Sequence, residues 1–189
     1  EDHSGNILIS TNGGLFILEK DRAEAVQAEL PELIKEQEAQ LISFAKEDSH
    51  RNLWIGTREK GLWLRRKESG RFVNYAHDEF ASESISNNSV TCIFEDMSGL
   101  IWVGTYGDGA DRFSPETGNI LHFFHDPRDH TSISTNKVYC FAEAPDGRIW
   151  IGTRGKGVNV LDMSTYEVKQ FEHPEFDQRI TGLEVILSI

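Results

Sequence analysis

The stretch Leu100-Ile101-Trp102-Val103-Gly104-Thr105 decides the fold, because the chain repeats it at a fixed interval. It returns as RIWIGT at 148–153 and occurs earlier as NLWIGT at 52–57, so that three tryptophans stand 48 residues apart. A weaker copy, NILIST at 6–11, places Leu8 46 residues before Trp54. A fixed period of this size is typical of a repeat architecture.

Each repeat is predicted to contain four short strands, and residues 89–124 show them most clearly. Runs of apolar and β-branched residues alternate there with turns that contain Gly, Asp, Ser or Pro, which favours an antiparallel meander. The predicted strands are Ser89–Phe94, Leu100–Thr105, Ala110–Phe113 and Asn119–Phe124. Four strands per period of about 48 residues is the spacing of a β-propeller blade.

We therefore predict an all-β fold, a β-propeller segment of four four-stranded antiparallel blades. The segment forms a closed four-bladed ring, a ring shared by two chains, or an arc of a larger propeller. Residues 1–189 are expected to be a single propeller module, with approximate repeats 1–46, 47–94, 95–142 and 143–189.

The repeated positions indicate structural roles. Trp54, Trp102 and Trp150 are expected to be largely buried on equivalent second strands, between neighbouring blades. Gly104, which follows one of them, indicates the close approach of another backbone. Cys92 and Cys140 occupy the same position in successive repeats, too far apart for a disulfide, and are expected to be small buried hydrophobes.

The two ends of the chain depart from the regular repeat. The first blade lacks an inner strand, and Leu183–Ile189 is an inner strand with no blade after it. We expect this strand to pair beside Ile7–Thr11, of the same chain or of a partner chain, since pairing removes two open sheet edges. In residues 21–40 we expect a short strand near Ala25–Leu30 and then one helical turn from Pro31, with a helical insertion as the alternative.

Composition excludes some classes of partner. The 189 residues carry a formal net charge of −12 and a sequence pI of about 5.0. Such a surface repels phosphate backbones, so no nucleic-acid partner is expected. No apolar run approaches 18 residues, so no membrane contact is expected within this segment. The chain begins at Glu1 without a signal peptide, so its compartment has no direct sequence indication.

Three patterns together resemble the two-component regulator propeller repeat. They are Glu-Asp-x-x-Gly-x-Ile-Trp-Val-Gly-Thr from Glu95, Gly-Ala-Asp-Arg-Phe from Gly109, and His-Asp-Pro-x-x-x-Thr-Ser-Ile-Ser-x-Asn from His125. The likeness covers nearly the whole chain, with three good copies and one weak copy. The first copies depart from the pattern, with Leu8 in place of Trp and Arg51 in place of the turn Gly. These departures make the match weaker near the start of the chain.

The resemblance implies a sensor region of a bacterial hybrid histidine kinase or related signalling protein. It also implies a periplasmic location and propellers of about seven blades. Many proteins that the repeat resembles sense oligosaccharides and control polysaccharide utilisation, so the resemblance implies the same role here. An Asp-box turn at Asp146–Trp150 is a weaker likeness because its spacing differs from that of Asp96 and Trp102, and no WD dipeptide is present.

Candidate ligand-binding residues lie in the loops between the second and third strands, which emerge on one face of a propeller. Residues that differ between otherwise repeated loops can confer specificity, and this face mixes aromatic, cationic and carboxylate groups suited to sugar hydroxyls or an anionic saccharide. The candidates are Arg58, Lys60, Tyr106, Asp108, Arg154 and Lys156.

Other polar residues that recur between blades are expected to be structural. His77, His125 and His173 are predicted to hydrogen-bond a neighbouring loop, and Asp96 and Asp146 to cap their own hairpin turns. No metal site and no cofactor are expected.

The function expected is that of a ligand-sensing or binding module without catalytic residues, because no nucleophile elbow, P-loop, HExxH or dinucleotide motif is present. Its partner is then a small molecule or oligosaccharide. A homodimer, or further blades of a longer chain, is the expected protein contact. The alternatives are a protein-interaction scaffold and a propeller-fold carbohydrate-active enzyme.

Overall fold

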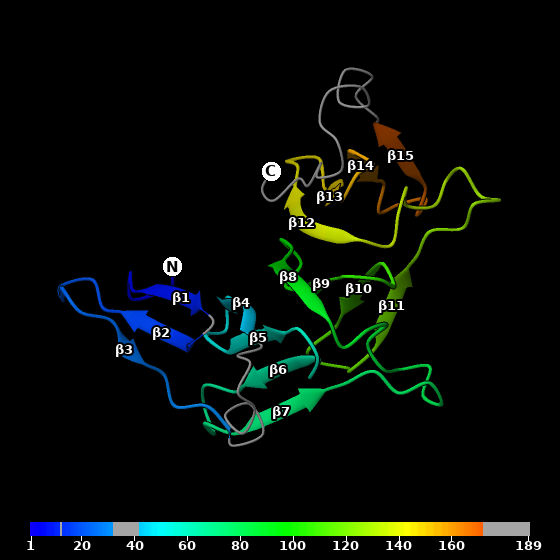
Figure 1. Cartoon of the computed structure of the whole chain (residues 1–189). Helices are drawn as coiled ribbons and strands as arrows, with labels where there is room; N and C mark the ends of the chain where they lie inside the picture. The colour runs from blue at the N-terminus through cyan, green and yellow to red at the C-terminus, as the bar shows by residue number, and fades with distance from the viewer. Residues whose placement is uncertain (12, 32–41, 172–189) are drawn as a thin grey trace.

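The computed structural model describes residues 1–11, 13–31 and 42–171, which form antiparallel β-sheets joined by turns (Figure 1). Within each sheet the strands follow one another in chain order as a meander. The sheets are blade 1 with β1 (Ile7–Thr11), β2 (Gly14–Leu18) and β3 (Val26–Gln27); blade 2 with β4 (Ile42–Glu47), β5 (Leu53–Thr57), β6 (Leu62–Arg65) and β7 (Phe72–Tyr75); blade 3 with β8 (Val90–Glu95), β9 (Ile101–Thr105), β10 (Ala110–Phe113) and β11 (Ile120–Phe123); and blade 4 with β12 (Val138–Glu143), β13 (Ile149–Thr153), β14 (Val158–Leu161) and β15 (Val168–Phe171).

The predicted all-β propeller fold is confirmed, and the four strands predicted within residues 89–124 correspond to β8–β11. The first sheet has three strands among the described residues, and β1 occupies the position of the second strand in the other blades. The short strand expected near Ala25–Leu30 is β3, whereas the helical turn expected after it lies outside the described residues.

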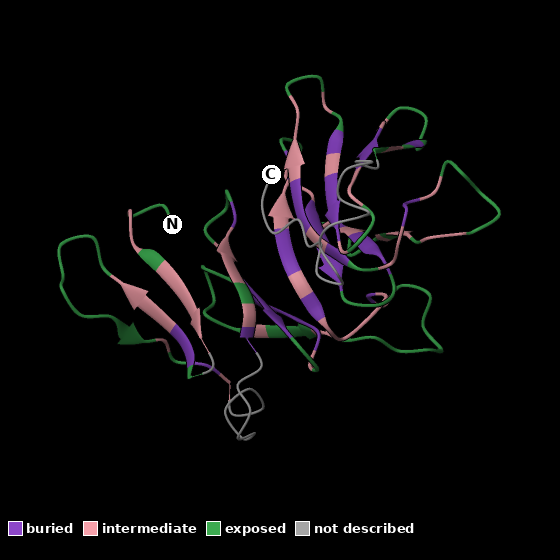
Figure 2. Cartoon of the chain, turned by 45° about the horizontal axis from the view of Figure 1, so that its top comes forward, coloured by how far each residue is buried: buried purple, intermediate pink, exposed green. Residues whose placement is uncertain are grey.

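The hydrophobic core lies between successive blades. Apolar side chains from the facing surfaces of two sheets form one cluster at each of the three joints. In Figure 2 the buried residues are concentrated on the central strands of blades 2 to 4, while blade 1 is mostly intermediate or exposed. Because burial of apolar area is the main stabilising term, each blade depends on its neighbours.

The repeated tryptophans lie on equivalent second strands, as predicted. Trp54 and Trp102 are completely buried, and each lies in the cluster shared with the following blade. Trp150 is only partly buried. Its ring stacks on Phe171 of its own sheet, with centroids 6.3 Å apart, and no described sheet follows blade 4 to cover it.

Gly104 marks a close approach, but the neighbours are side chains and not the backbone that we expected. A Cβ atom at this position would lie 2.5 Å from Cys92 Sγ and 3.1 Å from Val138 Cγ1 of the next blade. Gly56 meets Val90 of the following blade in the same way. The missing side chain therefore makes room for a valine of the neighbouring inner strand.

Cys92 and Cys140 are buried, and neither forms a disulfide within the described residues, as predicted. Burial raises the pKa of the Cys92 thiol to about 12, so that the thiol stays protonated at neutral pH. These residues therefore behave as small hydrophobic side chains.

An aspartate anchors the turn before the repeated tryptophan in two blades. Asp96 Oδ1 accepts hydrogen bonds from the backbone N–H groups of Ser98 and Leu100, at 2.9 and 3.0 Å. Asp96 Oδ2 accepts from Trp102 Nε1 at 2.9 Å, and Asp48 makes the same bond to Trp54 at 2.8 Å. In blade 4 the equivalent residue is Ala144, so that Trp150 has no such partner at this position.

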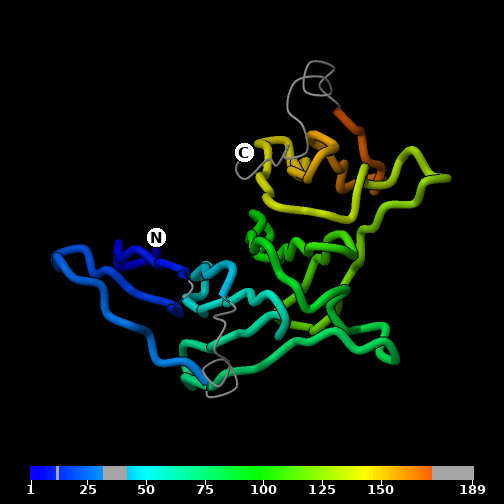
Figure 3. The backbone as a smooth tube through the Cα atoms, in the orientation of Figure 1, coloured from blue at the N-terminus to red at the C-terminus, as the bar shows by residue number. Residues whose placement is uncertain are grey.

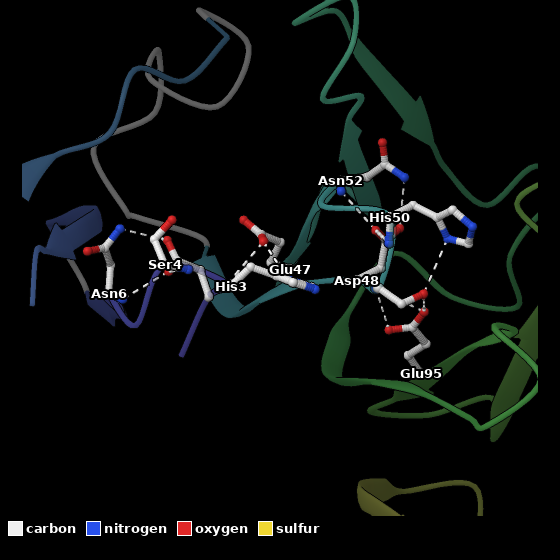
Figure 4. A network of polar contacts seen from close by, with 10 residues as sticks. His3, Ser4, Asn6, Glu47, Asp48, His50, Asn52 and Glu95 are labelled. Carbon is white, nitrogen blue, oxygen red and sulfur yellow. Dashed lines mark hydrogen bonds and ion pairs between the residues drawn. The ribbon is translucent and has the colours of Figure 1, made fainter.

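A glutamate at the end of each inner strand fastens that blade to the one before it. Its carboxylate accepts a hydrogen bond from a backbone N–H in the first turn of the preceding blade, an arrangement that we call the Glu joint. The three joints pair Glu47 with His3 at 3.2 Å, Glu95 with Ser49 at 2.8 Å, and Glu143 with Met97 at 2.6 Å. Figure 4 shows Glu47 beside His3 and, at the next joint, Glu95.

The four blades follow one another along an open arc, with blade 1 and blade 4 at opposite ends (Figures 1 and 3). The long connections 76–89 and 124–137 project on the same side of this arc, at the right of Figure 3. The predicted pairing of Leu183–Ile189 with Ile7–Thr11 lies outside the described residues and stays a prediction.

Candidate functional site

The loops that carry the predicted ligand-binding residues have a common scaffold. In each, a buried threonine at the end of the second strand donates its hydroxyl hydrogen to the carbonyl of the glycine four residues later, at 2.8–2.9 Å. That glycine has positive φ, and at Gly109 a Cβ atom would lie 2.1 Å from Phe123 O. The scaffold fixes the loop backbones, so that differences between blades lie in the side chains.

Two of the six predicted residues meet at the joint between blades 3 and 4. Arg154 Nη1 donates a hydrogen bond to Tyr106 Oη at 2.8 Å, and its guanidinium carbon lies 5.9 Å from the centre of the Tyr106 ring. Lys137 Nζ lies 5.4 Å from the same ring centre. The ring of Tyr139 meets Tyr106 edge-on, with centroids 6.4 Å apart. We call these four residues the Tyr106 cluster.

The Tyr106 cluster is a local concentration of positive charge on an acidic chain. Neither Lys137 nor Arg154 forms an ion pair with a carboxylate of the described residues. Tyr106 is 42% exposed, so its ring is accessible to solvent. The bond to Tyr106 uses one of the five N–H donors of the Arg154 guanidinium. The arrangement therefore suits an anionic group that lies against an aromatic ring.

The other four predicted residues are not part of this cluster. Asp108 Oδ2 accepts a hydrogen bond from Asn87 Nδ2 at 2.6 Å, which fixes its carboxylate beside the long connection. Arg58 is exposed in the equivalent loop of blade 2. Lys60 and Lys156 accept hydrogen bonds at their carbonyl oxygens, from Asn74 and from Ser134 respectively.

Sequence reasoning missed Lys137 and Tyr139 because neither belongs to the varying loop. Lys137 directly precedes the inner strand β12, and Tyr139 lies within it. Each inner strand has a register shift after its first residue, and Tyr139 is the residue that this bulge displaces. A bulge re-aims its side chain, which brings Tyr139 toward Tyr106. The equivalents of Tyr139 are Ser43 and Thr91, whose hydroxyl groups donate to backbone carbonyls of the next blade. A comparison of inner-strand positions between repeats would have singled it out.

The two recurring histidines that the structure describes have a structural role, as predicted, but each bonds within its own connection and not to a neighbouring loop. Nδ1 of His77 lies 2.9 Å from the carbonyl oxygen of Ile85, and Nδ1 of His125 lies 2.8 Å from that of Ile133. His173 lies outside the described residues. Among residues 1–11, 13–31 and 42–171, no group of three or more His, Cys, Asp or Glu is arranged to hold a metal ion.

The turn aspartates also have the predicted role. Asp96 holds the turn before Trp102, as described above, and Asp146 accepts a hydrogen bond from the Arg148 backbone N–H at 3.2 Å. Asp146 also pairs with the Arg148 guanidinium, which lowers the pKa of the Asp146 carboxyl. Both carboxylates are thus engaged in local structure.

Comparisons with known proteins agree with the propeller fold and its repeats. The sequence model of the two component regulator propeller family matches residues 84–107 and 132–155. Two segments of the chain therefore carry the two-component regulator propeller repeat. Each match runs from a long connection through an inner strand and its neighbour to the loop that holds Tyr106 or Arg154. No curated protein is similar enough in sequence to match the chain.

Three solved structures of extracellular or cell-surface proteins share the fold. An extracellular domain assigned to a hybrid two component system of B. thetaiotaomicron is 23% identical, with a TM-score of 0.73, over 92% of this chain and 24% of its own. An extracellular domain assigned to a one component system of the same organism is 23% identical, with a TM-score of 0.62, over 90% and 22%. PorZ, a surface component of the type-IX secretion system of Porphyromonas gingivalis, is 17% identical, with a TM-score of 0.63, over 98% and 27%.

The chain therefore spans about a quarter of the length of these proteins. Within the described part of the chain there is no helix of the length and apolar character needed to cross a membrane.

Proposed function

We propose that this chain is a ligand-sensing propeller segment of a bacterial two-component signalling protein, and that it binds an anionic oligosaccharide on its loop face. The observation that carries the proposal is the Tyr106 cluster, in which Lys137 and Arg154 approach one accessible tyrosine ring without a carboxylate partner among the described residues. The repeat family and the extracellular domains with the same fold support the signalling role and a location outside the cytoplasmic membrane.

The chemistry favours an acidic sugar over a neutral one. A guanidinium offers paired N–H donors to a carboxylate or sulfate, and an ammonium adds a compact positive charge. The tyrosine ring supplies an apolar surface for the sugar ring, with Tyr139 beside it. Because the protein has a formal net charge of −12, it attracts an anionic ligand only where cationic side chains gather. This directs the ligand to the joint between blades 3 and 4.

The test is binding to an array of acidic and neutral glycans, followed by calorimetry on the acidic glycans that bind. Lys137→Ala combined with Arg154→Ala should weaken binding at least tenfold, and binding should weaken as salt is raised. Arg71→Ala is the matched control, because it removes an exposed cation from the turn between β6 and β7. It should leave the affinity unchanged.

Four results would contradict the proposal. Equal binding of the neutral form of the same glycan would remove the role of the cations. Cleavage of the glycan would indicate an enzyme, and capture of a protein partner without glycan binding would indicate a scaffold. Loss of binding on Arg58→Ala with Lys60→Ala, but not on the Arg154 variant, would move the site to blade 2.

A further inference from the structure

A groove is lined by residues of β11 in blade 3, of β15 in blade 4 and of the connection between the two blades. β11 and β15 are the outer strands of neighbouring sheets, on the rim of the arc (Figure 1). It encloses about 430 Å³, which lies within the range of small-molecule pockets. We call it the rim groove. Its apolar wall includes Leu121, Phe123, Phe124, Ile133, Tyr166 and Val168, and its polar wall includes His122, Asp126, Asp129, Thr131 and Ser132.

Two large aromatic side chains distinguish the rim groove from the corresponding place between blades 2 and 3. Phe124 is 60% exposed and Tyr166 is 50% exposed. One repeat earlier these positions hold Ala76 and Gly118. The blade 2–blade 3 joint is formed with the small residues, so the fold does not require the aromatic ones.

Tyr166 is also held in a strained backbone conformation. Its φ is 61°, in the left-handed region that a bulky residue rarely adopts. The equivalent residues, Gly70 and Gly118, have φ of 65° and 77°, which glycine adopts freely. The Tyr166 ring stacks on Phe123, with centroids 6.3 Å apart. Strained residues that persist in a fold often mark functional sites, and here the strain places an aromatic ring beside the groove.

Carboxylates complete the polar wall. Asp129 Oδ1 accepts hydrogen bonds from the Thr131 backbone N–H at 2.8 Å and from the Thr131 hydroxyl at 2.7 Å. These bonds lower the pKa of Asp129, so that it stays ionised. The negative charge of Asp126 is partly neutralised by the exposed guanidinium of Arg128, whose Nε lies 3.2 Å from Asp126 Oδ1. The groove therefore holds a fixed negative charge beside exposed aromatic rings.

We propose that the rim groove binds a small organic cation of the alkylammonium class, which lies against the rings of Phe124 and Tyr166 and beside the carboxylate of Asp129. Aromatic faces attract cations that have left water, and quaternary ammonium groups are recognised in this way. His122, the basic side chain in the wall, has its Nδ1 2.7 Å from the buried carboxylate of Asp111, which balances its charge. The site is separate from the Tyr106 cluster and does not depend on the function proposed above.

The decisive measurement compares choline with 3,3-dimethyl-1-butanol, which has the same shape but no charge. Both are titrated into the whole chain by calorimetry. Choline is expected to bind about tenfold more tightly, the factor that a cation–π contact and a nearby carboxylate together supply. Equal affinities, or no binding of choline, would overturn the proposal. So would binding of a lysine-containing peptide without binding of choline, because the groove would then be a protein-docking surface.

The neighbouring joint supplies variants that should not disturb folding. Phe124→Ala and Tyr166→Gly reproduce Ala76 and Gly118, and Asp129→Ala reproduces Ala81. Each is expected to weaken choline binding severalfold, and the first two together at least tenfold. Tyr166→Gly should leave Tm unchanged or higher because it relieves the strain. Tyr166→Phe should retain binding. A Tyr166→Gly variant with lower Tm and intact choline binding would make the ring a structural feature and refute the proposal.

Discussion

Removing the Asp96 carboxylate should destabilise the joint between blades 3 and 4. Asp96 is 7% exposed and accepts three hydrogen bonds, from two turn N–H groups and from the Trp102 indole. Asp96→Ala leaves the indole N–H buried without a partner, which costs about 1–3 kcal/mol, and also removes the turn bonds. Together we expect a loss of about 3–5 kcal/mol in the free energy of unfolding.

Urea unfolding followed by tryptophan fluorescence measures this loss. Asp146→Ala is the matched control, since this exposed turn aspartate has no indole partner, and it should leave the unfolding midpoint nearly unchanged. A double-mutant cycle with Trp102→Phe isolates the indole bond, and the two changes should be less than additive. A loss below about 1 kcal/mol for Asp96→Ala, or full additivity in the cycle, would refute the assigned role of the carboxylate.

Three further predictions concern single positions. Gly104→Ala should destabilise the protein by about 1–3 kcal/mol because its Cβ atom would lie 2.5 Å from Cys92 Sγ, and Cys92→Ala in the same chain should restore part of the loss. Arg51→Gly should stabilise by about 1 kcal/mol in urea unfolding, because Arg51 has φ of 63° where other repeats have glycine, and unchanged or lower stability would contradict this. The hydrogen bond to Asp111 raises the pKa of His122 above its ordinary 6.5. Protonated His122 therefore stabilises the fold fully below about pH 6.5, and this stabilisation is lost as the pH rises through the pKa of the folded state. His122→Asn should remove this pH dependence of Tm.

Much of the fold could be predicted because the repeat itself carries the information. The interval between Trp54 and Trp102 sets the blade length, and turn residues between apolar runs set the strand boundaries. The partial exposure of Trp150 could not be predicted, because burial depends on the neighbour that covers a side chain. The neighbour of Gly104 was likewise misjudged, since a glycine indicates lack of space without saying which atoms fill it.

The candidate site was predicted less completely, for a related reason. Variation between loops singled out Tyr106 and Arg154, which the structure brings together. The search was confined to the loops between the second and third strands, so it missed Lys137, which directly precedes β12, and the displaced Tyr139 within β12. Tyr166 was also missed, because its backbone conformation becomes apparent only when it is aligned with Gly70 and Gly118 of the earlier repeats.

The Glu joint has a direction, which limits how the propeller can be lengthened by gene duplication. Each blade presents a carboxylate to the blade before it and a backbone N–H to the blade after it. An inserted second copy of residues 96–143 would bring its own Met97 N–H and Glu143, so every new junction would be bonded like the existing ones. A blade added after blade 4 would instead meet Pro145 at the donor position, and proline has no N–H to give. Duplication of residues 96–143 therefore preserves every Glu joint, whereas the position of Pro145 in blade 4 offers no N–H for one.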